Sequence, residues 1–187
     1  MPPHSFGTHY TITVFGESHG TGIGVVIDGC PSGVELDLGA IQTELDRRRP
    51  GQSQISTPRQ EHDQIEVLSG LHNGKTTGAP ITCFIRNRDQ RSKDYSLFRQ
   101  VPRPSQIDWP AMQRYGEAVD LRGSGKFSGR LTAPLVIAGA IAKQCLAQHG
   151  IQIGAYVRQI GTIDDPTEYT VATIQAQVEK TMVRTVD

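Results

Sequence analysis

Residues 132–148 restrict the possible folds of this chain more than any other segment. They are apolar almost all the way round a helix of 3.6 residues per turn, with Pro134 in the first turn and Gly150 just past the end. Such a helix has to be buried against other elements. Its most apolar stretch, residues 131–142, is too short to span a bilayer. The sequence therefore predicts a buried core helix and no association with a membrane.

The rest of the chain mixes strand and helix patterns without regular alternation. Strand patterns cover residues 10–15, 23–27, 64–68, 80–85 and 151–160. Helix patterns cover residues 38–49, which Pro50-Gly51 ends, and residues 170–183. Residues 86–106 lack periodicity and are predicted to be a long loop, which is either functional or mobile. Together these patterns predict an α+β fold.

Charge is unevenly placed along the chain, although its 187 residues hold 19 basic and 19 acidic side chains. Residues 47–59 and 86–130 carry 14 of the basic and five of the acidic residues, a local balance of +9. Acidic residues interrupt the second window, so a continuous surface for nucleic acid is not indicated. A small polyanionic ligand bound in a cleft fits this pattern better.

The cysteines and the N-terminal segment bear on the compartment. The three cysteines are far apart and form no Cys-x-x-Cys pair, which is typical of reduced thiols in a cytoplasmic protein. The first basic residue is Arg47, so a signal or transit peptide is not expected. The six histidines show no metal-ligand spacing, and we expect no metal site.

Residues 16–20 read Gly-Glu-Ser-His-Gly, which formally matches the Gly-x-Ser-x-Gly elbow of α/β-hydrolases. That elbow requires a helix after the serine, whereas a strand pattern follows here, so the hydrolase interpretation fails. A glycine-flanked loop that presents Ser18 and His19 to a ligand is one interpretation. A tight turn with incidental polar residues is the other.

Two further segments could recognise anions. Arg47, Arg48 and Arg49 end a predicted helix; the helix dipole explains one or two of them, and three indicate anion recognition. Residues 123–130 form a Gly-rich run with Lys126 and Arg130 directly before the long helix, without the Walker A spacing. A flexible linker is the alternative for this second segment.

These motifs, taken in order along the chain, resemble the chorismate synthase family. The matching stretches are residues 15–20, 28–33, 45–53, 74–81, 89–96, 127–133 and 138–144. The resemblance implies a β-α-β sandwich in which helices pack between antiparallel sheets. Because the family's chains are about twice as long, it makes residues 1–187 the N-terminal portion of one such domain, with the C-terminal half absent. It also implies a homotetramer for the whole protein.

The resemblance implies a reaction as well. The family is a lyase that converts 5-enolpyruvylshikimate 3-phosphate to chorismate and phosphate by 1,4-elimination, in the shikimate pathway of aromatic amino-acid biosynthesis. It uses reduced FMN, which some members reduce with NADPH. By resemblance, His19 is the catalytic general acid. The substrate-binding residues implied are Ser18, Arg48, Arg103 and Arg130, and the FMN-binding residues implied are Lys126, Phe127, Ser128 and Arg48.

Two departures from the family pattern bear on activity. Gln106 stands where the family has a second catalytic histidine, and an amide cannot release a proton at neutral pH. Gln54 stands where the family often has another arginine. The resemblance also places the rest of the FMN site and an acid–base aspartate in the C-terminal half, so we expect this portion alone to be inactive. The alternative is an inactive or fragmentary member that only binds flavin or phosphate. A domain that completes a split protein with a partner is a third hypothesis.

Overall fold

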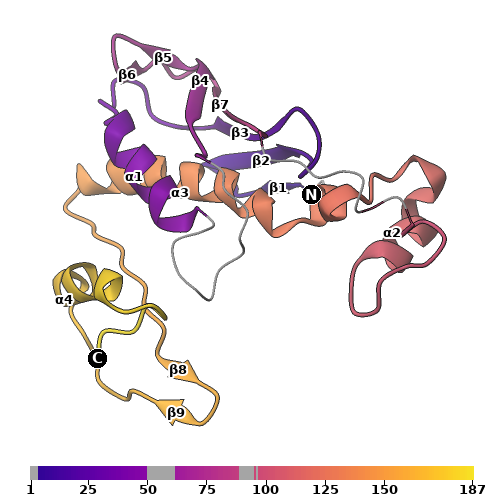
Figure 1. Ribbon diagram of the computed structural model, residues 1–187. Helices are drawn as coiled ribbons and strands as arrows, with labels where there is room; N and C mark the ends of the chain where they lie inside the picture. The colour runs from indigo at the N-terminus through magenta and orange to yellow at the C-terminus, as the bar shows by residue number, and fades with distance from the viewer. Residues whose placement is uncertain (1–3, 50–61, 89–94, 96) are drawn as a thin grey trace. The chain divides into compact units, whose positions relative to one another are not determined.

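The computed structural model describes residues 4–49, 62–88, 95 and 97–187 (Figure 1). The chain divides into two compact units, residues 1–142 and residues 143–187. All the candidate site residues that the structure describes belong to the first unit. Gln54, and the Pro50-Gly51 pair expected to end a helix, lie outside the described residues.

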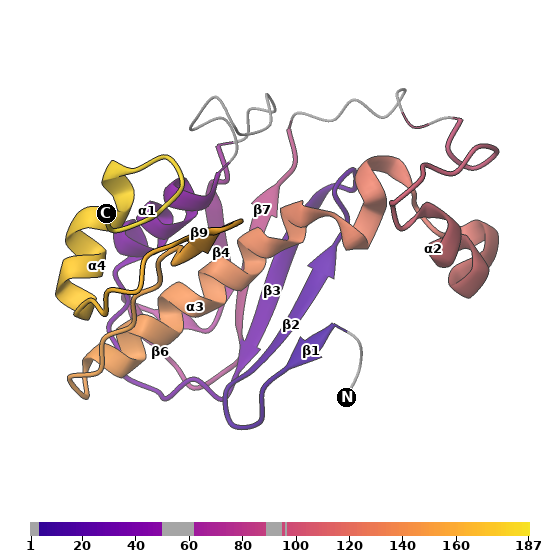
Figure 2. The same cartoon turned by 90° about the horizontal axis from the view of Figure 1, so that it is seen from below.

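A five-stranded antiparallel sheet forms the base of the first unit, in the order β1-β2-β3-β7-β4. Its strands are β1 (Ser5–Phe6), β2 (Thr11–Gly16), β3 (Gly22–Asp28), β7 (Ile81–Arg86) and β4 (Ile65–Ser69). Four of them coincide with the predicted strands to within two residues at each end. Both α1 (Leu38–Arg48) and α3 (Thr132–Ala147) lie on one face of this sheet (Figures 1 and 2).

Alternation of side chains along the strands builds the core under these helices. The cross-strand register aligns Ile12, Ile27 and Ile81 in one row and Val14, Val25 and Cys83 in the next. Except for Val14, which is half-buried, these side chains are buried, and the two central strands contribute the fully buried ones. Ile41 and Leu45 of α1 are fully buried as well. The hydroxyl of Tyr10 donates to the carbonyl of Ala138, 2.9 Å away, and so ties β2 to α3.

The long apolar helix is confirmed, but its burial is one-sided. Ala133, Ile137 and Ile141 face the core and are almost inaccessible to solvent. Leu135 is 46% exposed and Gly139 is exposed on the other side. The prediction of burial all round was therefore wrong for the described chain, because its single large sheet covers only one face of the helix.

Two small hairpins accompany the sheet. In the first unit β5 (Leu71–His72) pairs with β6 (Lys75–Thr76). Their turn places Asn73 and Gly74 at positive φ, as a two-residue hairpin turn requires. In the second unit β8 (Gln159–Ile160) pairs with β9 (Ile163–Asp164), beside α4 (Val171–Gln177).

The sequence patterns were less accurate toward the C-terminus. A strand over residues 151–160 was wrong except at Gln159–Ile160, because only the short β9 pairs with that segment. The predicted helix at 170–183 is shorter: α4 passes into a 3₁₀ turn at Val178–Lys180. The helix α2 (Asp108–Tyr115) was not predicted. No helix among the described residues is long and apolar enough to cross a bilayer.

The thiol of Cys83 gives a chemical test of this core. Burial on β7 raises its pKa to about 12, so the thiol stays protonated. Because the thiolate is the nucleophile, we expect iodoacetamide at mildly alkaline pH to leave Cys83 unmodified in the folded chain and to alkylate it in denaturant. Peptide mass spectrometry measures both. Rapid alkylation of Cys83 in the folded chain would contradict this packing.

Candidate functional site

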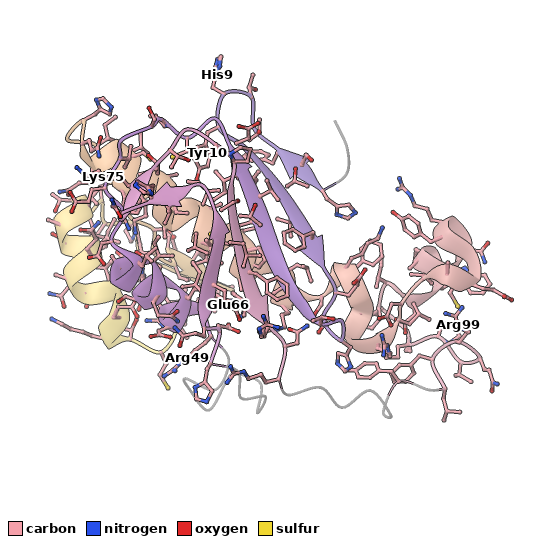
Figure 3. The ribbon with its side chains drawn as sticks, turned by 90° about the horizontal axis from the view of Figure 1, so that it is seen from above. His9, Tyr10, Arg49, Glu66, Lys75 and Arg99 are labelled. Carbon is pink, nitrogen blue, oxygen red and sulfur yellow. The ribbon has the colours of Figure 1, made fainter. Side chains whose placement is uncertain are left out.

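The turn from Gly16 to Gly20 joins β2 to β3, so its serine and histidine sit at one end of the sheet. Because a strand follows, the hydrolase elbow is excluded. Ser18 is 1% and His19 is 6% exposed, which is unusual for polar side chains in a tight turn. Figure 3 labels Glu66, which marks this end of the sheet; Tyr10 marks the other. Burial of both side chains therefore favours a loop that presents Ser18 and His19 to a ligand over a tight turn with incidental polar residues.

The Gly-rich run packs directly on this turn. Gly123, Ser124 and Gly125 all have positive φ, between 53° and 67°. A Cβ on Gly123 would lie 2.5 Å from Cδ2 of His19 and 2.8 Å from Oγ of Ser18. The amide of Ser18 donates to the carbonyl of Gly125 at 3.2 Å. The glycines therefore allow the backbone to cover the imidazole, and the run is an ordered part of the site instead of a free linker.

Arg103 reaches the same run from the segment before α2. Its Nε and Nη2 donate to the two carboxylate oxygens of Asp108, at 2.8 and 2.7 Å, and Nη2 also donates to Oγ of Ser124 at 3.2 Å. Asp108 is fully buried, and the hydrogen bond from Arg103 lowers the pKa of its carboxyl group. Nη1 of Arg103 donates to no described atom.

Aromatic rings link Arg103 to the histidine. The guanidinium lies 4.4 Å from the ring centroid of Phe98 and 5.5 Å from that of Tyr95. Tyr95 in turn meets His19 edge to face, with centroids 4.9 Å apart. Gln106, the residue at the position of the second catalytic histidine, is exposed on the segment that carries Arg103.

A second pair of arginines converges on one buried carboxylate. Nη1 of Arg130 donates to Asp63 at 2.6 Å, and Nη1 of Arg48 donates to its other oxygen at 3.1 Å. Arg48 also donates to Oγ1 of Thr132 and to the carbonyl of Gly129. Asp63 is 2% and Arg130 is 5% exposed. Arg48 and Arg130 are therefore held around one buried carboxylate, and we refer to the three residues as the Arg48–Asp63–Arg130 cluster.

The segment implied for the flavin lies beside two cavities. Nζ of Lys126 sits 3.6 Å from the ring centroid of Tyr115, and Phe127 is 40% exposed. Lys126 lines a cavity of about 390 Å³ whose walls are mainly apolar, including Ile12, Val14, Leu131 and Leu135. It also lines a smaller one of about 240 Å³ next to Glu17 and Asp120. Oγ of Ser128 accepts from the amide of Arg130 and is used to cap a 3₁₀ turn.

The structure therefore brings Ser18, His19 and Arg103 around the Gly-rich run, and Arg48 and Arg130 around Asp63. Sequence reasoning missed four residues that hold these groups: Asp63, Asn87, Tyr95 and Asp108. Three of them, Asn87, Tyr95 and Asp108, lie within the charged window of residues 86–130. The described residues contain no group of three or more His, Cys, Asp or Glu that could hold a metal ion.

Comparisons with known proteins agree with one another. A family model described as chorismate synthase matches residues 10–187. A chorismate synthase of Methanococcoides burtonii is 48% identical over 187 residues, which is 100% of this chain and 50% of that protein. One of Parabacteroides distasonis is 54% identical over 160 residues, 86% of this chain and 44% of that protein.

The fold comparison gives the same result. A crystal structure of chorismate synthase superimposes with a TM-score of 0.71 at 28% identity, covering 96% of this chain and 49% of that chain. The predicted α+β fold is confirmed. The chain spans about half the length of the relatives it matches.

Proposed function

The chain belongs to the chorismate synthase family, and from this premise we propose that it takes part in converting 5-enolpyruvylshikimate 3-phosphate to chorismate and phosphate. The family's role in aromatic biosynthesis, as a lyase that needs a reduced flavin, supports this proposal. The chain spans about half the length of its relatives, so we propose the site residues for this part of the protein. We also propose a cytoplasmic location and a homotetramer for the whole protein.

The connection of the His19 turn to two arginine groups is the observation that carries the proposal. Arg103 donates to Ser124 of the Gly-rich run that covers the imidazole. Asn87 donates to the backbone of the His19 turn and accepts from Arg130 of the Arg48–Asp63–Arg130 cluster. A substrate with a phosphate and two carboxylates needs fixed cations on more than one side, and guanidinium binds both groups through paired hydrogen bonds.

Each arginine has its own role in the proposed binding of the substrate. Arg48 and Arg130 are held by a buried carboxylate, so their orientation is fixed before an anion arrives and little reorganisation is needed. Arg103 keeps Nη1 for the substrate while Asp108 fixes the rest of its guanidinium. Ser18, beside His19 in the turn, offers a hydroxyl as a further donor.

His19 is the residue that we propose moves a proton. Imidazole exchanges protons near neutral pH, which suits a general acid toward the departing phosphate or the flavin. Its burial under Gly123 and against Tyr95 limits its ring to a narrow range of orientations. Restricted orientation of an acid is worth a large part of its catalytic effect.

The residues near Lys126 fit a flavin. Apolar walls suit a planar ring system, the ammonium group of Lys126 suits an anion, and an exposed aromatic face is available on Phe127. When bound, reduced FMN supplies electron density to the substrate and recovers it, so there is no net redox change. NADPH is proposed as the reductant, with no residue assigned to it.

The alternative is a chain that binds flavin or phosphate without turnover. Gln106 favours it, because its amide cannot donate a proton in place of the second histidine. The two functions differ in one outcome: both bind phosphate or flavin, and only the first releases chorismate.

An anaerobic assay of the full-length protein with reduced FMN and 5-enolpyruvylshikimate 3-phosphate tests the proposal by following chorismate. We expect His19→Gln to lower kcat by about 10²–10⁴-fold, the usual contribution of a general acid. His72→Gln, on the exposed β5–β6 hairpin, is the control and should leave kcat unchanged. No chorismate from the wild-type full-length protein, with flavin still bound, would support the alternative.

A further inference from the structure

Asn87, directly after β7, makes four hydrogen bonds that join two parts of the site. Its backbone amide donates to the carbonyl of Thr21 at 3.1 Å. Its Nδ2 donates to the carbonyls of Glu17 and Gly20, both at 2.9 Å. Its Oδ1 accepts from Nε of Arg130 at 2.6 Å. The two carbonyls on Nδ2 stand immediately before Ser18 and immediately after His19.

Chemistry fixes the orientation of this amide. Two carbonyl oxygens can only accept, so the group facing them has to be NH₂, and Nε of Arg130 can only donate, so it has to meet the oxygen. Both amide protons of Asn87 and its Oδ1 therefore take part in hydrogen bonds at the same time. Among the twenty side chains, only an amide of this length supplies two donors on one branch and an acceptor on the other.

We infer that Asn87 is a positioning residue that holds His19 in register with Arg130. This inference rests on the proposed function, in which His19 moves the proton and Arg130 binds the anion. Asn87 closes the turn around His19 through two carbonyls and anchors the guanidinium of Arg130 on its other side. Asp63 fixes the same guanidinium through Nη1, so both ends of the connection are rigid. Through these bonds the amide of Asn87 contributes to the distance between the proton donor and the bound anion.

The isosteric Asn87→Asp variant keeps the hydrogen bond with Arg130 and removes those to the turn around His19. A carboxylate still accepts from Arg130, so that this buried arginine keeps its partner and the fold is retained. It has no donor for Glu17 and Gly20, and its charge repels both carbonyl oxygens. The matched control is Asn73→Asp, at the only other asparagine of the chain, an exposed turn residue between β5 and β6.

The first measurement needs no turnover. We expect diethyl pyrocarbonate to modify His19 at least about fivefold faster in Asn87→Asp than in wild type, because the turn opens locally. The exposed His9 is the internal reference, and Asn73→Asp should match wild type at His19. A His19 rate within twofold of wild type in folded Asn87→Asp, on the scale of ordinary local fluctuation, overturns the inference.

The second measurement separates positioning from a structural role. We expect Asn87→Asp to lower kcat by at least about tenfold, and to cause no further loss in a His19→Gln background, since a residue that acts through His19 loses its effect with it. Losses that multiply in the double variant overturn the inference. If the wild-type protein shows no turnover, the proposed function is contradicted. The modification rate of His19 then tests the role of Asn87 by itself.

Discussion

An Asp63→Ala variant is expected to lose about 3–5 kcal/mol of unfolding free energy, the usual cost of removing one partner from a buried ion pair. Asp63 is 2% exposed and accepts from both Arg48 and Arg130. Without it, two guanidinium groups lose the carboxylate that they share, and Arg130, itself 5% exposed, keeps its charge in a buried position. Repulsion between the two guanidinium groups and the desolvation of Arg130 both lower the free energy of unfolding.

Denaturant unfolding followed by circular dichroism measures this loss. Glu66→Ala is the matched control, because Glu66 also pairs with an arginine, Arg86, through two hydrogen bonds. That pair is exposed, so its loss should cost less than about 1 kcal/mol. Equal losses of unfolding free energy in the two variants would contradict the expectation that burial makes the Asp63 ion pairs more important for stability than the exposed Glu66 pair.

The main elements of the fold could be predicted because their patterns are local. Local strand patterns placed β2, β3 and β7, and the apolar segment placed α3, each within two residues of its ends. Elements that depend on partners distant in the sequence could not be predicted from local patterns. The residues around β8 have strand-like composition, but a strand exists only where another strand pairs with it, and only β9 does so. The exposed face of α3 was missed for the same reason.

The site shows the same division between local and distant information. Ser18, His19 and the Gly-rich run were found because each belongs to a continuous motif. Asp63 and Asn87 were not, since each is a single polar residue whose partner Arg130 lies 67 and 43 positions away. Neither spacing carries a periodic signal, and only the folded chain shows that the side chains meet.

Charge counting from the sequence was informative but incomplete. It located a +9 excess in two windows that include Arg48, Arg103 and Arg130. The structure shows that Asp63, which lies outside both windows, neutralises part of this excess by pairing with Arg48 and Arg130. Asp108, already included in the count, pairs with Arg103. The cations are therefore held in fixed directions, and the charge left for a ligand is smaller than the count indicates.

A Gly123→Ala variant is expected to lower kcat by about a hundredfold, the typical effect of moving a reacting group by about 1 Å. The new methyl group would lie 2.7 Å from Nε2 of His19 and 2.8 Å from Oγ of Ser18, closer than real contacts allow. Neither neighbour can move easily: both are buried, and the amide of Ser18 is bonded to Gly125. The imidazole has to leave the position in which Tyr95 holds it.

Backbone strain has to be separated from this displacement, because Gly123 has φ +57° and an alanine there costs about 1–2 kcal/mol in any surroundings. Gly74→Ala supplies the control, since Gly74 has φ +76° with no atom within 4 Å of an added Cβ. Both variants should lose stability in urea, and only Gly123→Ala should lose turnover in the anaerobic assay. A Gly123→Ala chain that keeps wild-type kcat would mean that the close contact with His19 does not set its catalytic position.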